Sequence, residues 1–180
     1  MNLPFFTIGH STRTLEEFAG LLLEVEIGFL ADIRKFARSR TNPQFNEDNL
    51  AGALAIRGIS YEHVAALGGR RGKAPGVPPD VNALWKNQSF HNYADYAASP
   101  QFRAALDDLR DEGRKRRCAM MCSEAVWWRC HRRIVTDYLI ASGETVFHIM
   151  GEGRLEPARL TPGAIVEPGG KVIYPRLPES

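Results

Sequence analysis

The chain has 180 residues, of which 44% are hydrophobic, and a formal net charge of +2 at pH 7. This length suffices for one well-buried core and is short for two, so we expect a single domain over residues 1–180. A nearly neutral charge excludes the global basic field that would by itself indicate nucleic-acid binding.

Two further features of composition bear on location. No stretch approaches the roughly 18 apolar residues of a membrane span, and the run at 1–7 is too short for a signal-peptide core. We therefore expect a cytoplasmic protein without membrane contact. The cysteines number three, and an odd count favours reduced thiols over a disulfide framework.

Short apolar runs alternate with helical patterns along the chain. Strands are expected at 5–8, 28–33, 58–64, 118–122, 144–150 and, in the tail, 172–174. Helices are expected at about 14–25, 46–56, 100–113 and from 129 to a glycine cap at 143. Residues 73–98 are expected to form a long irregular insertion, and 151–180 a tail rich in proline and glycine. The alternation predicts an α/β fold with a mostly parallel, Rossmann-like sheet of about five strands, flanked by helices, with the 118–122 strand central.

Most of the unusual polar residues follow the expected strands. In a parallel sheet the loops after the strands open at one edge, where α/β proteins place their ligands. The loops in question are 9–13, 32–40, 67–72, 122–132 and 150–153. This convergence predicts a site at the carboxyl edge of the sheet.

Several short motifs occur in a fixed order. They are Thr7-Ile8-Gly9-His10-Ser11, Asp32-Ile33-Arg34, Ser39-Arg40, Asn42-Pro43-Gln44-Phe45, Leu67-Gly68-Gly69-Arg70, Met121-Cys122-Ser123-Glu124 and Cys130-His131-Arg132. With these motifs the chain resembles, over nearly its whole length, the bacterial and archaeal family called domain of unknown function 488. The resemblance implies a family signature at Cys122, Glu124, Cys130, His131 and Arg132 and assigns these residues no role. The family often has a proline where this chain has Trp127. Such a proline would only stiffen the turn.

Cys122 is the candidate nucleophile. It ends a buried strand ahead of the expected helix N-terminus, whose dipole would stabilise a thiolate, and Arg129 and Arg132 would add positive charge. The spacing from Cys122 to Arg129 is one residue longer than the Cys-x5-Arg loop of phosphatases and sulfurtransferases, and this loop has no glycine. The alternative is a small buried residue without chemistry.

Three other side chains, Asp32, Glu124 and His10, are candidate acid–base groups. Neighbouring arginines would keep the carboxylates ionised. The alternative is an ion-pair network that only fixes the loops, because buried arginines need carboxylates in either case.

An anionic ligand is expected from the clustered arginines. Arginine forks and a glycine-rich loop can both bind phosphate. Of the adjacent Trp127 and Trp128, only one can point into the core, so the other is a candidate wall of the ligand site. The predicted substrate-binding residues are Ser11, Arg34, Arg38, Gly69, Arg70, Trp128, Cys130, His131 and Arg132.

A metal site is the remaining alternative at these residues. Cys122, Cys130 and His131 are ligand types, but structural zinc sites usually have two ligands two to four residues apart, and Cys-x7-Cys-His does not. Cys118 lies four residues before Cys122, or about 13 Å along a strand. We therefore predict no metal and no other cofactor.

Together these patterns predict an enzyme, a hydrolase or transferase of unassigned reaction, with a phosphate-containing substrate such as a nucleotide or a nucleic-acid component. Two alternatives stay open: a non-catalytic module that binds a nucleotide or nucleic acid, and a small metal-binding interaction domain. Nothing in the pattern indicates an oligomeric state.

Overall fold

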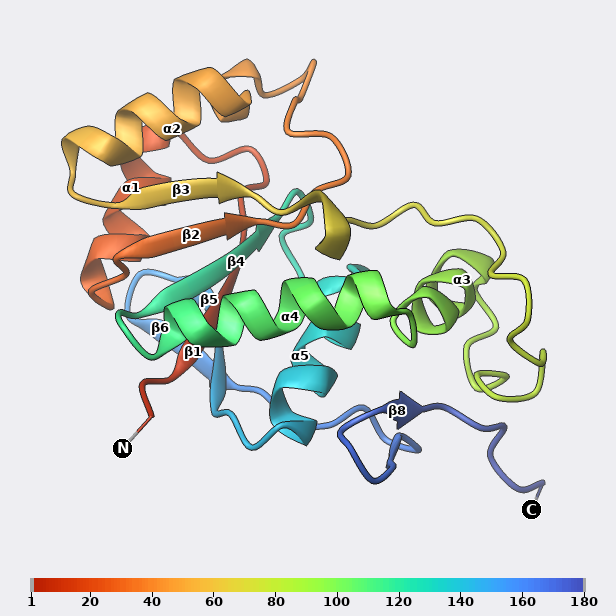
Figure 1. The fold of residues 1–180 in the computed structure, drawn as a ribbon. Coiled ribbons are helices and arrows are strands. Elements are labelled where there is room, and N and C mark those ends of the chain that lie inside the picture. The colour runs from red at the N-terminus through yellow and green to blue at the C-terminus, as the bar shows by residue number, and fades with distance from the viewer. Residues whose placement is uncertain (1, 180) are drawn as a thin grey trace.

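The computed structural model describes residues 2–179, and at its centre is a six-stranded sheet (Figure 1). The strands are β1 (Phe5–Gly9), β2 (Phe29–Asp32), β3 (Ser60–His63), β4 (Cys118–Cys122), β5 (Val146–Gly151) and β6 (Arg154–Pro157). Their order is β3-β2-β4-β1-β5-β6. The pairs among β1 to β5 are parallel, and β6 is antiparallel to β5. The strand that carries Cys118 and Cys122 is therefore central, as predicted.

Helices cover both faces of the sheet. They are α1 (Leu15–Glu24), α2 (Glu47–Ile56), α3 (Gln88–Tyr96), α4 (Pro100–Gly113) and α5 (Arg132–Ala141), with 3-10 turns η1 (Pro43–Phe45), η2 (Ala65–Leu67) and η3 (Trp127–Arg129). α1 and α2 pack on one face, and α3, α4 and α5 pack on the other. A small second sheet pairs β7 (Ile165–Val166) with β8 (Val172–Ile173).

Burial on both faces explains the continuous apolar run of β4. Met120 faces the core formed with α4 and α5, whereas Met121 faces the core formed with α1 and α2. All five residues of β4 are buried, which is typical of a strand with helices on both sides. In register, Gly9 of β1 lies beside Cys122, and Asp32 of β2 lies beside Met121. The ends of these three strands are thus nearly level, and their following loops begin at one edge.

The structure confirms the predicted α/β fold and the mostly parallel sheet. Three details differ. The insertion at 73–98 is not irregular throughout, because α3 begins after Asn87, whose side chain caps the first turn. The helix after β4 begins at Arg132, since η3 occupies the preceding turn. The tail contains β6 and β7 as well as the expected strand near residue 172.

Within residues 2–179, no helix has both the length and the apolar composition needed to cross a membrane.

Candidate functional site

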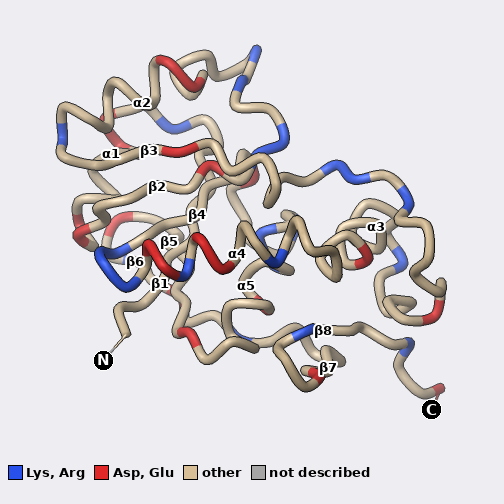
Figure 2. The backbone as a smooth tube through the Cα atoms, in the orientation of Figure 1, with Lys and Arg blue, Asp and Glu red and all other residues tan. Residues whose placement is uncertain are grey.

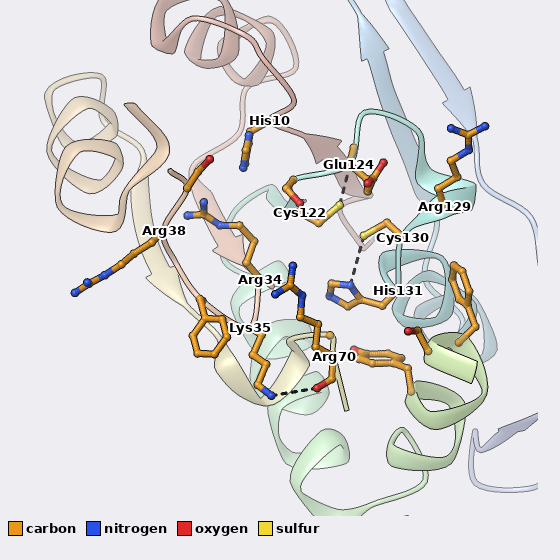
Figure 3. Close-up of a pocket in the computed structure, with 17 residues that line it drawn as sticks. His10, Arg34, Lys35, Arg38, Arg70, Cys122, Glu124, Arg129, Cys130 and His131 are labelled. Carbon is orange, nitrogen blue, oxygen red and sulfur yellow. Dashed lines mark hydrogen bonds between the residues drawn. The ribbon is translucent and has the colours of Figure 1, made fainter. Parts of the chain in front are cut away.

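A cleft of about 470 Å³ opens at the carboxyl edge of the sheet (Figure 3). Loops that follow β1, β2, β4 and η2 contribute to it, together with α3. Its charged lining is mostly basic, and Figure 2 shows the basic segments that follow β2 and η2 beyond the strand ends. The charged residues of the lining are Arg34, Lys35, Arg38, Arg70, Arg129 and a single carboxylate, Glu124. The charged lining of the cleft is therefore net positive.

Arg34 is fixed at the base of the cleft by a buried ion pair. Its Nε donates to Asp32 Oδ1 at 2.9 Å, and its Nη2 donates to Asp32 Oδ2 at 2.7 Å. Nη2 also donates to the carbonyl of Phe45 at 2.7 Å, and the Tyr61 hydroxyl donates to the same carboxylate. The remaining nitrogen, Nη1, has no hydrogen-bond partner among the described residues. Arg34 thus keeps one buried donor, at the base of the cleft, without a partner among these residues.

His10 supplies an acceptor beside this donor. Its ring stacks on Phe45, with centroids 4.3 Å apart, and its Nδ1 lies 2.8 Å from the carbonyl of Ser11. Because a carbonyl only accepts, Nδ1 carries the proton, and Nε2 of the neutral ring is a free acceptor without a partner in residues 2–179. Burial, together with the positive charge of Arg34, lowers the pKa of His10. The imidazole is therefore neutral near pH 7 and can accept a proton.

The Cys122 thiol lies under the cleft and is only 2% exposed. Arg132 is fully buried behind it, and Nη1 of this arginine donates to Cys122 Sγ at 3.1 Å. Burial alone would raise the pKa of Cys122, but the neighbouring Cys130 thiol and the positive charge of Arg132 outweigh it, and the pKa is lowered. The arrangement stabilises a thiolate at the end of β4.

A second thiol, that of Cys130, lies at the N-terminus of α5. The backbone N–H of Arg132 points to Cys130 Sγ at 3.4 Å, and His131 Nδ1 lies 3.5 Å from the same sulfur. His131 Nε2 lies 2.7 Å from the carbonyl of Ile33 and must be its donor, so Nδ1 is the acceptor for the Cys130 S–H. Burial lowers the pKa of His131 to about 4. Burial and the neighbouring Cys122 raise the pKa of Cys130 well above its usual value. This thiol stays protonated.

Close backbone approaches fix the walls of the cleft. A Cβ on Gly9 would lie 1.7 Å from the carbonyl oxygen of Glu124, so the loop after β4 crosses directly over the end of β1. A Cβ on Gly69 would lie 2.9 Å from His131 Nδ1. These two glycines are needed for the approach of neighbouring segments.

The loop after η2 is held by α3. The Tyr93 hydroxyl donates to the carbonyl of Leu67 at 2.6 Å, and the Tyr96 hydroxyl donates to that of Ala66 at 2.6 Å. Arg71 turns back to the carbonyls of Gly68 and Ala65. Arg70 has a φ of 56°, a left-handed conformation, and its side chain lines the cleft.

The family model described as Domain of unknown function DUF488 matches residues 14–139. The chain belongs to this family. In this DUF488 protein the match includes β2, the loop after η2 and the whole segment from Cys122 to Arg132, whereas His10 precedes it. No curated protein and no solved structure matches the chain.

Most of the predicted site residues of this DUF488 protein come together. Those that line the cleft are His10, Arg34, Arg38, Gly69, Arg70, Cys122, Glu124, Cys130 and His131. They come from loops more than 100 residues apart in sequence, as between His10 and His131. The edge of the parallel sheet is what unites them.

Four predicted residues lie elsewhere. Asp32 is buried behind Arg34, and its carboxylate forms an ion pair with the Arg34 guanidinium. Arg132 is buried behind Cys122, where its guanidinium also donates to the carbonyls of the loop after β4, and it does not line the cleft. Trp128 is 44% exposed and does not line the cleft. Ser11 contributes its backbone, whose N–H donates to the carbonyl of Ser123 at 3.0 Å.

Cys122 was expected to lie beside the N-terminus of the following helix, and this expectation is wrong. The thiol beside a helix N-terminus is Cys130, because α5 begins at Arg132 and its first N–H points to that sulfur. Cys122 obtains its positive neighbour from the Arg132 side chain, whereas Arg129 is exposed at the rim.

Several lining residues were not among the predicted site residues. They are Lys35, Phe36, Ser39, Ser89, Phe90, Tyr93, Ser123 and Arg129. The signal for α3 was present in the capping Asn87 and in aromatic residues three apart at Phe90, Tyr93 and Tyr96. Among residues 2–179, no group of three or more His, Cys, Asp or Glu side chains is arranged to hold a metal ion.

Proposed function

We propose that this protein is an enzyme, a hydrolase or transferase, that acts on a phosphate-bearing substrate such as a nucleotide or a nucleic-acid component. Cys122 is the nucleophile and His10 the acid–base group. One observation carries the proposal. A thiol with a lowered pKa lies in a basic cleft that also contains a free acceptor, His10 Nε2, and a free donor, Arg34 Nη1.

Size and charge support a small anionic ligand. A cleft of about 470 Å³ is within the usual range for small-molecule sites. Arg34 has one guanidinium nitrogen left to donate, and Arg70 also lines the cleft. Arginine forks bind phosphate oxygens with charge-assisted hydrogen bonds. Substrate phosphate therefore lies against these two residues.

The catalytic sequence uses two groups in turn. The Cys122 thiolate attacks the electrophilic centre held by the arginines, a bond forms to Sγ, and the bond to the leaving group breaks. His10 Nε2 then accepts a proton from water in a hydrolase, or from an acceptor hydroxyl in a transferase. The resulting oxygen nucleophile attacks the intermediate and releases the Cys122 thiolate.

Arg132 and Asp32 act through their neighbours in this scheme. Arg132 holds the Cys122 thiolate in its charged form, and Asp32 holds Arg34 in place. Neither touches the substrate. Glu124, at the exposed rim, contributes the carbonyl that lies over Gly9.

Thermal shift with inorganic phosphate and a panel of nucleoside mono-, di- and triphosphates tests binding. A ligand at 100 times its Kd adds about 2.7 kcal/mol to the free energy of unfolding. Arg70→Ala should weaken this effect, whereas Arg154→Ala, on the exposed β6, should leave it unchanged. Equal responses of wild type and Arg70→Ala would contradict the site.

Intact-protein mass spectrometry during turnover tests the chemistry. A covalent adduct on Cys122, lost in Cys122→Ser and kept in Cys118→Ser, is the expected result. Anion binding without an adduct or turnover would instead favour the non-catalytic binding module.

A further inference from the structure

Two of the three cysteines share one hydrogen-bond network at the base of the cleft. Arg132 contacts both sulfurs, with its side chain at Cys122 and its backbone N–H at Cys130. Figure 3 shows the two sulfur atoms facing one another. The chain thus brings together two sulfurs from the end of β4 and the start of α5.

The two thiols have different protonation states. Cys122 is the more acidic one, and Cys130 keeps its proton. The neutral His131 Nδ1 lies 3.5 Å from Cys130 Sγ and is an acceptor for that proton. A pair in which one sulfur is a nucleophile and the other has a base beside it is suited to stepwise oxidation.

The third cysteine is a natural control. Cys118 lies at the opposite end of β4, paired with Phe5, whereas Cys122 is paired with Gly9. Burial raises the pKa of Cys118 to about 12. Cys118 therefore lacks both the thiolate charge and the neighbouring sulfur that disulfide formation requires.

We propose that Cys122 and Cys130 form an oxidisable dithiol, which hydrogen peroxide converts into an intramolecular disulfide that closes the base of the cleft. Only the effect of this oxidation on activity rests on the proposed function, because a disulfide at Cys122 would remove the nucleophile. The oxidation itself requires no substrate.

The chemistry balances in two steps. The Cys122 thiolate attacks one oxygen of hydrogen peroxide, the O–O bond breaks, and with one proton the products are a sulfenic acid and water. The Cys130 sulfur then attacks Cys122 Sγ and gives up its proton. The S–O bond breaks, and the departing hydroxide takes the proton to form a second water. Two thiols lose two electrons, and one peroxide is reduced to two waters.

Reduction of this disulfide should be easy. The buried guanidinium of Arg132 stabilises the Cys122 thiolate, and a stabilised reduced form makes a disulfide more readily reduced. We therefore expect reversible oxidation, in which added dithiothreitol restores both thiols.

The test uses the reduced full-length protein, treated with hydrogen peroxide and then unfolded and alkylated. The mass before alkylation should fall by that of two hydrogen atoms, and only Cys118 should then take up alkylating reagent. Trypsin cleaves after Arg117, Arg129 and Arg132, so Cys122 and Cys130 lie on different peptides. The expected product is peptide 118–129 joined to peptide 130–132, and dithiothreitol should separate them.

Three matched variants identify the roles. Cys130→Ser should accumulate a sulfenic acid at Cys122 that dimedone traps, and Cys122→Ser should resist the same peroxide. Cys118→Ser should form the disulfide at the wild-type rate. Circular dichroism confirms that each variant is folded before treatment.

The inference is overturned if peroxide oxidises Cys122 to the sulfinic acid at the same rate in wild type and in Cys130→Ser, and if wild type yields no joined peptides. It is also overturned if the disulfide involves Cys118. These measurements contain no substrate, so failure of the disulfide leaves the proposed function standing. Conversely, turnover by Cys122→Ser would end the nucleophile role without affecting the dithiol.

Discussion

Replacement of Asp32 by Asn tests how the cleft holds its central arginine. Asp32 is fully buried, and Arg34 is 6% exposed. The carboxylate accepts two hydrogen bonds from the guanidinium, at 2.9 and 2.7 Å, and one from the backbone N–H of Arg34 at 3.2 Å. The substitution keeps the shape of the side chain and removes its charge.

The expected cost follows from the unpaired charge that remains. Breaking a buried ion pair by removing one partner costs about 3–5 kcal/mol, because the other charge stays buried. Tyr61→Phe removes only one hydrogen bond to the carboxylate and should cost about 2 kcal/mol. The double variant Asp32→Asn with Arg34→Met contains no buried charge here, so it should be more stable than Asp32→Asn alone. Its cost should also be well below the sum of the two single costs.

Urea unfolding at one pH of five proteins (wild type, Asp32→Asn, Arg34→Met, the double variant and Tyr61→Phe) measures these differences, with the slope compared to confirm that the denatured state is unchanged. The stability of a typical domain is about 5–15 kcal/mol, so Asp32→Asn can unfold much of the protein. Tyr61→Phe keeps the test informative in that case. A cost below about 1 kcal/mol for Asp32→Asn, or additive costs in the double variant, would refute the reasoning.

Four further substitutions test stability. Gly9→Ala should cost about 3 kcal/mol in urea unfolding, because its Cβ would meet the Glu124 carbonyl. Gly52→Ala, in α2 with open space around its Cβ, should instead gain about 0.5–1 kcal/mol. Arg70→Gly should gain about 1 kcal/mol by relieving a φ of 56°, while phosphate binding by thermal shift weakens. Burial lowers the pKa of His148 to about 3, below the unfolded value, so stability should fall as pH drops below about 6.5. By pH 5 the contribution of His148 lowers the free energy of unfolding by roughly 2 kcal/mol. Unfolding curves at pH 7.5 and pH 5 measure the loss of stability, which should be smaller by that amount in His148→Gln. An equal loss in wild type and His148→Gln would contradict this.

The sequence sufficed to predict that the polar loops meet at one edge of the sheet, because topology alone determines this. Parallel strands require that their following loops meet at one edge, so apolar runs ending in polar residues located the cleft without any knowledge of side-chain directions. His10, Arg70 and Cys122, from three distant segments, line the same cleft for this reason.

Side-chain directions were not predictable in the same way. Asp32 and Arg34 are two residues apart, and only the packed structure decides which one lines the cleft and which one is buried behind it. Arg129 and Arg132 were both expected beside Cys122, but only Arg132 contacts it, because η3 delays the start of α5 by a turn. The residues of α3 were missed because its Asn, His and Tyr residues are weak helix formers, so its stability comes from its cap and from contacts with the loop after η2.

The rate of Cys122 alkylation against pH, with and without inorganic phosphate, tests the central claim most directly. In Cys118→Ser, iodoacetamide labelling of peptide 118–129 reports Cys122 alone. The account predicts rapid labelling below pH 8.5, the usual pKa of a thiol, and saturable protection by phosphate that is lost in Arg70→Ala. Labelling only above about pH 8.5 or only after unfolding, at a rate that phosphate does not change, would contradict it.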